Sequence, residues 1–183
     1  LIKEMAGDLH MGISRLTRMT APVIAAVNGT AAGAGFSLGV AADLAISADN
    51  ARYVMAYTNA GLSPDGSSTY FLPRRVGDRR ARELMLTNRM LKADEAMAWG
   101  LVNEVVPAEE LMTRAKDLAT ELAAGPTLAF GEVKSLLNAS FDNGLETQME
   151  LESRAISRMS GTADGAEGIA AFLEKRGADF KGA

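Results

Sequence analysis

Apolar residues in the first part of the chain recur at steps of three and four positions, which is the spacing of one helix face. The series consists of Ile2, Met5, Leu9, Ile13 and Leu16. The pattern then changes to a continuous apolar run over residues 21–27, which predicts a buried strand that ends at the turn pair 28–29. The first 29 residues therefore predict an amphipathic helix followed by a strand.

Strand-like and helix-like patterns continue to alternate over the first hundred residues. Further strands are expected at Leu44–Ser47, at 51–55 and at 101–106, where Pro107 closes the last one. The turn around 64–66 is followed by two helical patterns separated by Gly77. Capping residues are expected for these helices, because hydroxyl and carboxylate groups accept the unpaired N–H groups of a first turn. The candidates are Ser67, Ser68 or Thr69 for the first helix and Asp78 for the second.

Beyond residue 107 the chain is almost entirely helical in pattern. One apolar stripe consists of Leu111, Ala115, Leu118 and Leu122. The pair 125–126 interrupts it, and the proline suits the first turn of a further helix. Two more helices are expected around Leu145–Met159 and Ala163–Lys175. We therefore expect an α/β part over residues 1–107 and a helical region over residues 108–183.

Composition narrows the functional classes. The 183 residues carry a net charge of −4 and contain no cysteine. An acidic chain argues against general nucleic-acid binding, which needs a basic surface. The lack of cysteine excludes disulfides, thiolate metal sites and a cysteine nucleophile. No run of 18 apolar residues occurs, so no membrane span is predicted. We expect a cytoplasmic protein with no metal site and no membrane partner.

The stretch "TAAGAGFSLG" raises the first question about chemistry, because its glycines follow a strand and open a helix. Dinucleotide binding would require a glycine directly at the strand end and an acid about 20 residues later, and neither is present. Small residues also permit close packing of a helix on a strand. A third interpretation is an oxyanion site, in which free N–H groups at the start of a helix stabilise an enolate.

Four blocks of sequence carry a resemblance to a known family. They are "APVIAAVNGTAAGAGFSLGVAADLAIS", "GLSPDGSSTYFLPRRVG", "ADEAMAWGLVNEVVP" and the ending "AFLEKRGADFKG". Together they resemble the crotonase (enoyl-CoA hydratase/isomerase) superfamily, and within it the isomerases of phenylacetate degradation. The resemblance implies a crotonase-like ββα spiral core followed by a helical trimerisation region. Family chains usually begin with further strands, so we expect an upstream segment to be missing.

The resemblance also implies an oxyanion hole for the thioester oxygen of an acyl-CoA. One of its two N–H donors matches Ala34, and the other belongs to the upstream segment. Gly33, next to Ala34, is expected to contact substrate. The two glutamates that hydratases use to add water match Ser37 and Tyr57, which are not carboxylates. Hydration is therefore not the favoured reaction, and both residues are expected to contact substrate.

Asp65 in "SPDG" matches the position of the acid in ring-opening and double-bond isomerases, and of the nucleophilic aspartate in aryl-CoA dehalogenases. A single carboxylate is sufficient for a 1,3 proton shift on a thioester whose oxygen is stabilised by N–H donors. By sequence alone, an aspartate in such a turn is also explained by hydrogen bonds to the backbone. We expect catalysis by Asp65, with Ala34 as oxyanion donor.

The expectations for coenzyme A binding and assembly come from the same resemblance, whereas those for His10, Trp99 and the arginines come from the residues themselves. Phe180 and Lys181 match tail residues that lie near the adenine end of coenzyme A in relatives. Coenzyme A would be part of the substrate, with no separate cofactor, and the helical region would build a homotrimer or a hexamer of two trimers. His10 is expected at the surface and Trp99 in the core. The five arginines of "PRRVGDRRAR" are expected on a solvated helix face, with the coenzyme A phosphates as the alternative partner.

These observations favour an acyl-CoA double-bond isomerase that works through an oxyanion-stabilised enolate. Three alternatives stay open at this point. They are an enoyl-CoA hydratase, a dehalogenase-like or thioesterase-like hydrolase with Asp65 as nucleophile, and a scaffold member of the family without catalysis.

Overall fold

The computed structural model describes residues 1–183, which form two compact units. The first unit comprises residues 1–17 and 23–116, and the second comprises residues 18–22 and 117–183. The first contains all strands and the second is helical, as the sequence pattern predicts. The division into a spiral core over residues 1–107 and a helical oligomerisation region over residues 108–183 stays a prediction.

Six short strands form two sheets in the first unit. The first sheet is entirely parallel, in the order β1-β3-β6, and consists of β1 (Ile24–Val27), β3 (Leu44–Ala48) and β6 (Glu104–Val106). The second has the order β2-β4-β5, with a parallel and an antiparallel pair, and consists of β2 (Thr30–Ala32), β4 (Arg52–Val54) and β5 (Leu91–Lys92). Parallel pairing requires crossover connections, and the intervening helices supply them.

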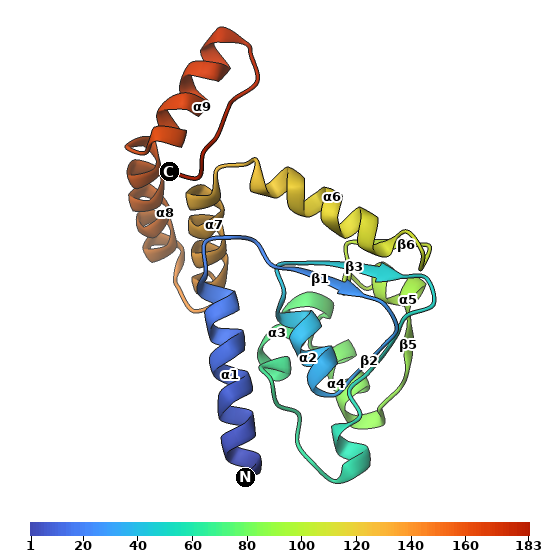
Figure 1. The fold of residues 1–183 in the computed structure, drawn as a ribbon. Coiled ribbons are helices and arrows are strands. Elements are labelled where there is room, and N and C mark those ends of the chain that lie inside the picture. Colours follow the sequence, from blue (N-terminus) through green and yellow to red (C-terminus); the bar gives the residue numbers. More distant parts are fainter. The chain divides into compact units, whose positions relative to one another are not determined.

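Helices of the first unit pack beside these strands (Figure 1). They are α1 (Ile2–Arg18), α2 (Ala34–Ala41), α3 (Ser68–Val76), α4 (Asp78–Thr87) and α5 (Ala93–Ala98), with a 3-10 helix η1 (Tyr57–Ala60). Helix α2 packs against β1 and β2, and α3 lies between α2 and α4. The start of α2 is therefore fixed by strands on one side and by α3 on another.

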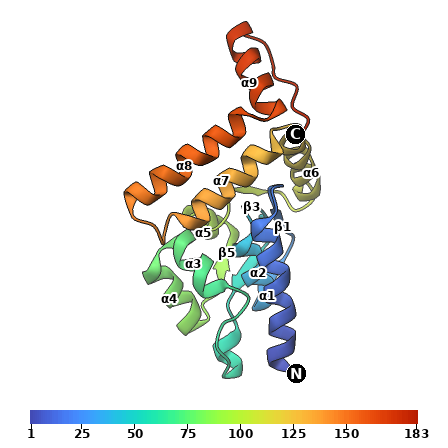
Figure 2. The ribbon, with the colours of Figure 1, turned by 90° about the vertical axis from the view of Figure 1, so that its left-hand side faces the viewer.

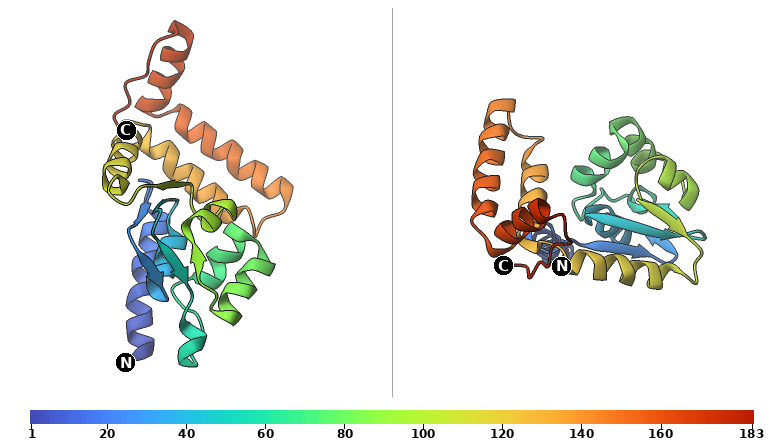
Figure 3. Two further views of the ribbon diagram at one scale, coloured as in Figure 1. Left: turned by 90° about the vertical axis from the view of Figure 1, so that its right-hand side faces the viewer. Right: turned by 90° about the horizontal axis from the view of Figure 1, so that it is seen from above.

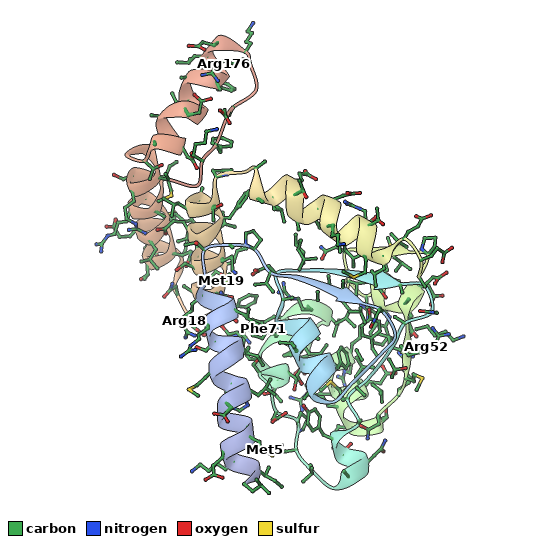
Figure 4. The ribbon with its side chains drawn as sticks, viewed as in Figure 1. Met5, Arg18, Met19, Arg52, Phe71 and Arg176 are labelled. Carbon is green, nitrogen blue, oxygen red and sulfur yellow. The ribbon has the colours of Figure 1, made fainter.

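The core of the first unit lies between its strands and helices, and two further views show α3 and α4 beside the strands (Figure 3). Its largest fully buried apolar side chains are Phe36, Ile46, Met55, Leu72, Leu84, Leu91 and Leu111. Within it the rings of Phe36 and Tyr53 lie 5.6 Å apart. Helix α1 has the predicted apolar face, but only Ile13 is buried there, while Met5 is 63% exposed (Figure 4).

The second unit contains the rest of α6 (Leu111–Ala123), followed by α7 (Thr127–Ala139), α8 (Leu145–Ser160) and α9 (Ala163–Glu174). Helices α7 and α8 lie side by side (Figure 2). Pro126 precedes α7 as its N-cap rather than standing in its first turn. Lys134 is buried on α7, and its Nζ donates to the Ala21 carbonyl at 2.9 Å, which ties residues 18–22 to this unit.

Besides the two-residue strand β5, two local elements, β2 and η1, were not predicted from the sequence patterns. Strand β2 lies within the glycine-rich stretch, where its three residues, Thr30–Ala32, are too few to show a period. The 3-10 helix η1 begins after Ala56, whose φ of +61° no apolar pattern predicts. Both elements flank the start of α2, so the missed structure lies next to the candidate site.

The expected helix caps were wrong. Ser67 does precede α3, but its φ is +61° and its side chain caps no N–H group. An N-cap of the usual kind needs an extended backbone, which allows the hydroxyl to reach the first turn. Asp78 is the first residue of α4 rather than its cap, and its carboxylate accepts instead from Arg82 Nε at 2.8 Å.

Candidate active site

The start of α2 is built on a glycine with an unusual backbone. Gly33 has a φ of +51°, a conformation that side chains other than glycine rarely adopt. Its N–H donates to the Val54 carbonyl at 3.1 Å, and its own carbonyl accepts from the Ser37 N–H at 2.9 Å. Gly33 therefore turns the chain from β2 into α2 while staying hydrogen-bonded to β4.

Ala34 is the first residue of the helix that follows, and it is exposed. N–H groups in the first turn of a helix have no acceptor within that helix, and the helix dipole favours negative charge near them. The Ala34 N–H therefore has the chemistry of an oxyanion donor.

Three side chains predicted from separate parts of the sequence meet one turn further along α2. Ser37 is fully buried, and its Oγ lies 3.2 Å from the Tyr57 hydroxyl. The Tyr57 hydroxyl in turn donates to Asp65 Oδ1 at 2.5 Å. Ser37 Oγ also reaches the Asp65 backbone carbonyl at 2.9 Å. The two positions that match the hydratase glutamates therefore form one polar network with the candidate acid.

The carboxylate of Asp65 is held through one oxygen only. Oδ1 accepts from Tyr57, whereas Oδ2 receives no hydrogen bond from the chain. Asp65 is half-buried, so its free oxygen is not enclosed by the core. Burial, and after it the hydrogen bond to Asp65, raises the pKa of Tyr57, which keeps this phenol in its neutral, donating form.

The turn that carries Asp65 is fixed by its backbone as well. Its carbonyl accepts from Ser68 Oγ at 2.9 Å in addition to Ser37. The next residue, Gly66, has a φ of +60° and is buried. A Cβ at Gly66 would lie 2.8 Å from the Ser37 Cβ, closer than real Cβ contacts. Only glycine therefore allows this turn to pack directly on α2.

His10 was expected at the surface, and it is exposed. It also contacts the turn that carries Asp65. Its Nε2 accepts from the Gly66 N–H at 3.1 Å. The apolar period of α1 gave no sign of this contact, because it joins positions 56 residues apart.

Trp99 was expected in the core, and that expectation was wrong. The indole is only half-buried, and the guanidinium carbons of Arg80 and Arg89 lie 4.7 and 4.8 Å from its ring centre.

Other arginines of the run "PRRVGDRRAR" also contact groups within the first unit. Arg74 stacks on the Tyr70 ring at 3.6 Å, and Arg75 donates to the Ala42 carbonyl at 2.9 Å. The arginine run is thus partly structural rather than simply a solvated face.

Phe180 and Lys181 lie on the tail that follows α9 in the second unit. Phe180 packs against Gly168, and the Lys181 ammonium pairs with Asp179 at 2.7 Å. Asp164, only 4% exposed, holds the backbone of this tail. Its two oxygens accept from the N–H groups of Lys181 and Gly182 at 2.7 and 2.8 Å. No pattern along the chain indicates Asp164 as the residue that holds the tail.

A hollow of about 360 Å³ lies in the first unit, bordered by residues of α1, β1 and α2. Gly35 and Leu38 are among its lining residues, whereas Ser37, Tyr57 and Asp65 are not. The chain contains no group of three or more histidine and acidic side chains arranged to hold a metal ion. None of its helices has the length and apolar character needed to span a bilayer.

The family model for enoyl-CoA hydratase/isomerase matches residues 3–183. The chain belongs to the enoyl-CoA hydratase/isomerase family. The 1,2-epoxyphenylacetyl-CoA isomerase of Escherichia coli (strain K12) is 43% identical over 171 residues, which cover 93% of this chain and 65% of that relative. The 4-chlorobenzoyl coenzyme A dehalogenase-1 of Arthrobacter sp. is 40% identical over 166 residues, covering 91% of this chain and 60% of that relative.

Solved structures of the same family share the fold. A crystal structure of an enoyl-CoA hydratase from Polaromonas sp. JS666 has a TM-score of 0.90 and 39% identity, covering 94% of this chain and 67% of that one. The crotonase-type α/β fold with C-terminal helices, which the sequence predicted, is therefore confirmed. This chain spans less than two thirds of the length of the two relatives named above.

Proposed function

We propose that the protein is an acyl-CoA double-bond isomerase in which Asp65 is the single acid/base. One observation carries this proposal. Tyr57 holds one oxygen of the Asp65 carboxylate, the other oxygen is free, and the turn is tied to the helix that begins with the Ala34 N–H. A carboxylate oriented in this way is suited to proton transfer at a defined point.

The proposed reaction begins with the thioester oxygen of a 3-enoyl-CoA accepting from the Ala34 N–H. A second donor would come from a segment outside these 183 residues. Asp65 then removes a proton from C2, and the negative charge that develops on the thioester oxygen is stabilised by the N–H donors. Asp65 returns the same proton to C4, the double bond moves into conjugation, and no water is consumed. One carboxylate therefore completes the cycle.

The residues around Asp65 favour isomerisation over hydration. Addition of water in this family is divided between two glutamates, and Ser37 and Tyr57 occupy those positions here. Ser37 is fully buried and its hydroxyl is occupied by protein partners, so we assign it support of the turn instead of contact with substrate. Tyr57 orients Asp65 and borders the substrate, and Gly33 supplies the turn that exposes the Ala34 N–H.

A second candidate function is hydrolysis with Asp65 as nucleophile. The similarity to a relative named as a 4-chlorobenzoyl coenzyme A dehalogenase favours it. In a dehalogenase-like reaction Asp65 would displace halide from an aryl-CoA and carry an aryl ester. In a thioesterase-like reaction it would displace the coenzyme A thiolate and carry a mixed anhydride. Either adduct would add the corresponding mass to the peptide that contains Asp65 until water hydrolyses it.

Coenzyme A recognition and assembly complete the proposal. Phe180 and Lys181 are assigned contact with the adenine end of coenzyme A. A trimer, or a hexamer of two trimers, is supported by large apolar side chains left exposed on the helices of the second unit. They include Leu145 at 68%, Ile156 at 72% and Phe172 at 83%.

The test is an assay of the full-length protein with 3-enoyl-CoA and 2-enoyl-CoA thioesters. Conjugation is followed by absorbance and water uptake by mass. We expect conversion of 3-enoyl to 2-enoyl thioester without a mass increase. Water uptake as the main reaction would contradict the assignment of Ser37 and Tyr57, and release of free coenzyme A with a covalent adduct on Asp65 would favour hydrolysis. Failure to bind any acyl-CoA would favour a scaffold member without catalysis.

A further inference from the structure

The peptide group that joins Asp65 to Gly66 is held at both of its ends by side chains. Its carbonyl oxygen accepts from the hydroxyls of Ser37 and Ser68, each at 2.9 Å. Its N–H donates to His10 Nε2 at 3.1 Å. Hydrogen bonds at opposite ends of one rigid peptide plane fix the rotation of that plane. The orientation of this peptide also sets the direction in which the Asp65 side chain leaves the backbone.

The two ends of this peptide are not equally secured. The carbonyl has two hydroxyl donors and a third contact from the Ser68 N–H at 3.2 Å. The N–H has one partner, and that partner comes from α1, far away in the sequence. Gly66 is buried, so water does not readily replace the imidazole. Removal of His10 would therefore leave a buried donor unpaired and release one end of the plane.

An imidazole that accepts at Nε2 carries its proton on Nδ1 in the neutral form. His10 is exposed and is the only histidine of the chain, so packing in the core does not explain its place on α1. Direct contact with substrate is not needed for it to influence the reaction. Small displacements of a catalytic group strongly reduce rates, because the reacting atoms must be held close together and aligned.

We propose that His10 is a positioning residue that holds the Asp65 turn through the Gly66 N–H. This role rests on the proposed function of Asp65 as the acid/base. It predicts that the acceptor on the side chain at position 10 controls the chemical step, while substrate affinity depends on it only weakly.

The experiment compares two substitutions in the full-length protein. His10→Phe keeps a planar ring but removes the acceptor, and His10→Gln restores an acceptor oxygen at a similar reach. Met11→Phe is the matched control, because Met11 is adjacent on α1 and 55% exposed. We expect His10→Phe to lower kcat for 3-enoyl-CoA about 10-fold with little change in KM. His10→Gln should recover most of that loss, and Met11→Phe should match the wild type.

A second measurement does not depend on turnover. The amide proton of Gly66, followed by NMR in protein with labelled glycine, should shift and exchange faster with solvent in His10→Phe, and it should do so less in His10→Gln. If the wild type is inactive on enoyl-CoA, the proposed function fails, and the Gly66 amide still tests the contact. If His10→Phe retains wild-type kcat, or His10→Gln is no better than His10→Phe, the positioning role is overturned.

Discussion

Asp65 and Asp164 show how differently one fold can use the same side chain. Asp164, in the second unit, is 4% exposed, and both of its oxygens accept backbone N–H groups of the C-terminal tail. Asp65, in the first unit, is half-buried, and only Oδ1 is hydrogen-bonded, to the Tyr57 hydroxyl. The two carboxylates differ in how many of their oxygens are left without a hydrogen bond from the protein. One carboxylate has both oxygens committed to the fold, and the other keeps an oxygen available.

The comparison separates two kinds of support. At Asp164 the side chain holds the backbone in place. At Asp65 the backbone is held by Ser37, Ser68 and His10, and the carboxylate is left with one partner. A group that must exchange a proton with substrate needs a fixed position without a full set of hydrogen bonds. Substitutions at the two aspartates should therefore fail in different ways.

The largest effect is expected from Asp65→Ala. Loss of the proposed acid/base should reduce isomerisation of 3-enoyl-CoA by about 10³-fold or more. The protein should stay folded, because no buried donor except the Tyr57 hydroxyl loses its partner. Circular dichroism and thermal unfolding serve as the control. Wild-type turnover in this variant would end the assignment of Asp65.

Asp164→Asn should lower the stability of the protein and change its activity little, the opposite of what is expected for Asp65→Ala. One of the two tail N–H groups would face an amide NH₂ instead of an oxygen, which should lower the free energy of unfolding by about 2 kcal/mol. Urea denaturation measures this loss. The kcat of any enzyme that stays folded should change much less than it does in Asp65→Ala. An unchanged denaturation midpoint would mean that Asp164 does not anchor the tail.

Tyr57→Phe tests the single hydrogen bond to Asp65. Without the phenol donor the carboxylate loses its orientation, and kcat should fall about 10-fold, as expected for one hydrogen bond to a charged group. Thermal stability should hardly change, because the ring keeps its packing. A rate equal to that of the wild type would show that Asp65 is oriented by its backbone alone.

The smallest effect concerns pH and the tail beyond α9. Hydrogen bonds first from Arg176 (Figure 4) and then from the Asp179 N–H lower the pKa of Glu167 from 4.5 to about 2. A depressed pKa means that this contact contributes fully above about pH 4.5 and is lost as the pH falls toward 2. The amide shift of Asp179 should follow this loss by NMR, and Glu167→Gln should abolish the pH dependence.

Much of the first unit could be predicted from apolar periods and from the resemblance to a family. Strands at Leu44–Ala48 and Glu104–Val106 and the long helices follow directly from the pattern. The position of Asp65 within the turn at 64–66 was also predicted. These features are encoded locally, by runs of residues whose spacing matches one type of element.

The contacts that hold Asp65 were not visible, because they depend on how distant segments pack. Ser37 and Asp65 are 28 residues apart, and His10 and Gly66 are 56 residues apart. The hydrophobic period of a helix or strand does not predict contacts between positions so far apart in the sequence. The Ser67 cap failed because its backbone is left-handed, with a φ of +61°, and a residue in this conformation does not place its hydroxyl on the first turn of the helix.

The placement of Trp99 has a practical consequence for all of these experiments. It is the only tryptophan, and its indole lies between two guanidinium groups at the junction of α4 and α5, within the first unit. Its fluorescence therefore reports on the unit that carries Asp65. Far-ultraviolet ellipticity receives a large share from α7, α8 and α9 of the second unit. One unfolding titration followed by both signals can resolve whether the two units melt together or in sequence.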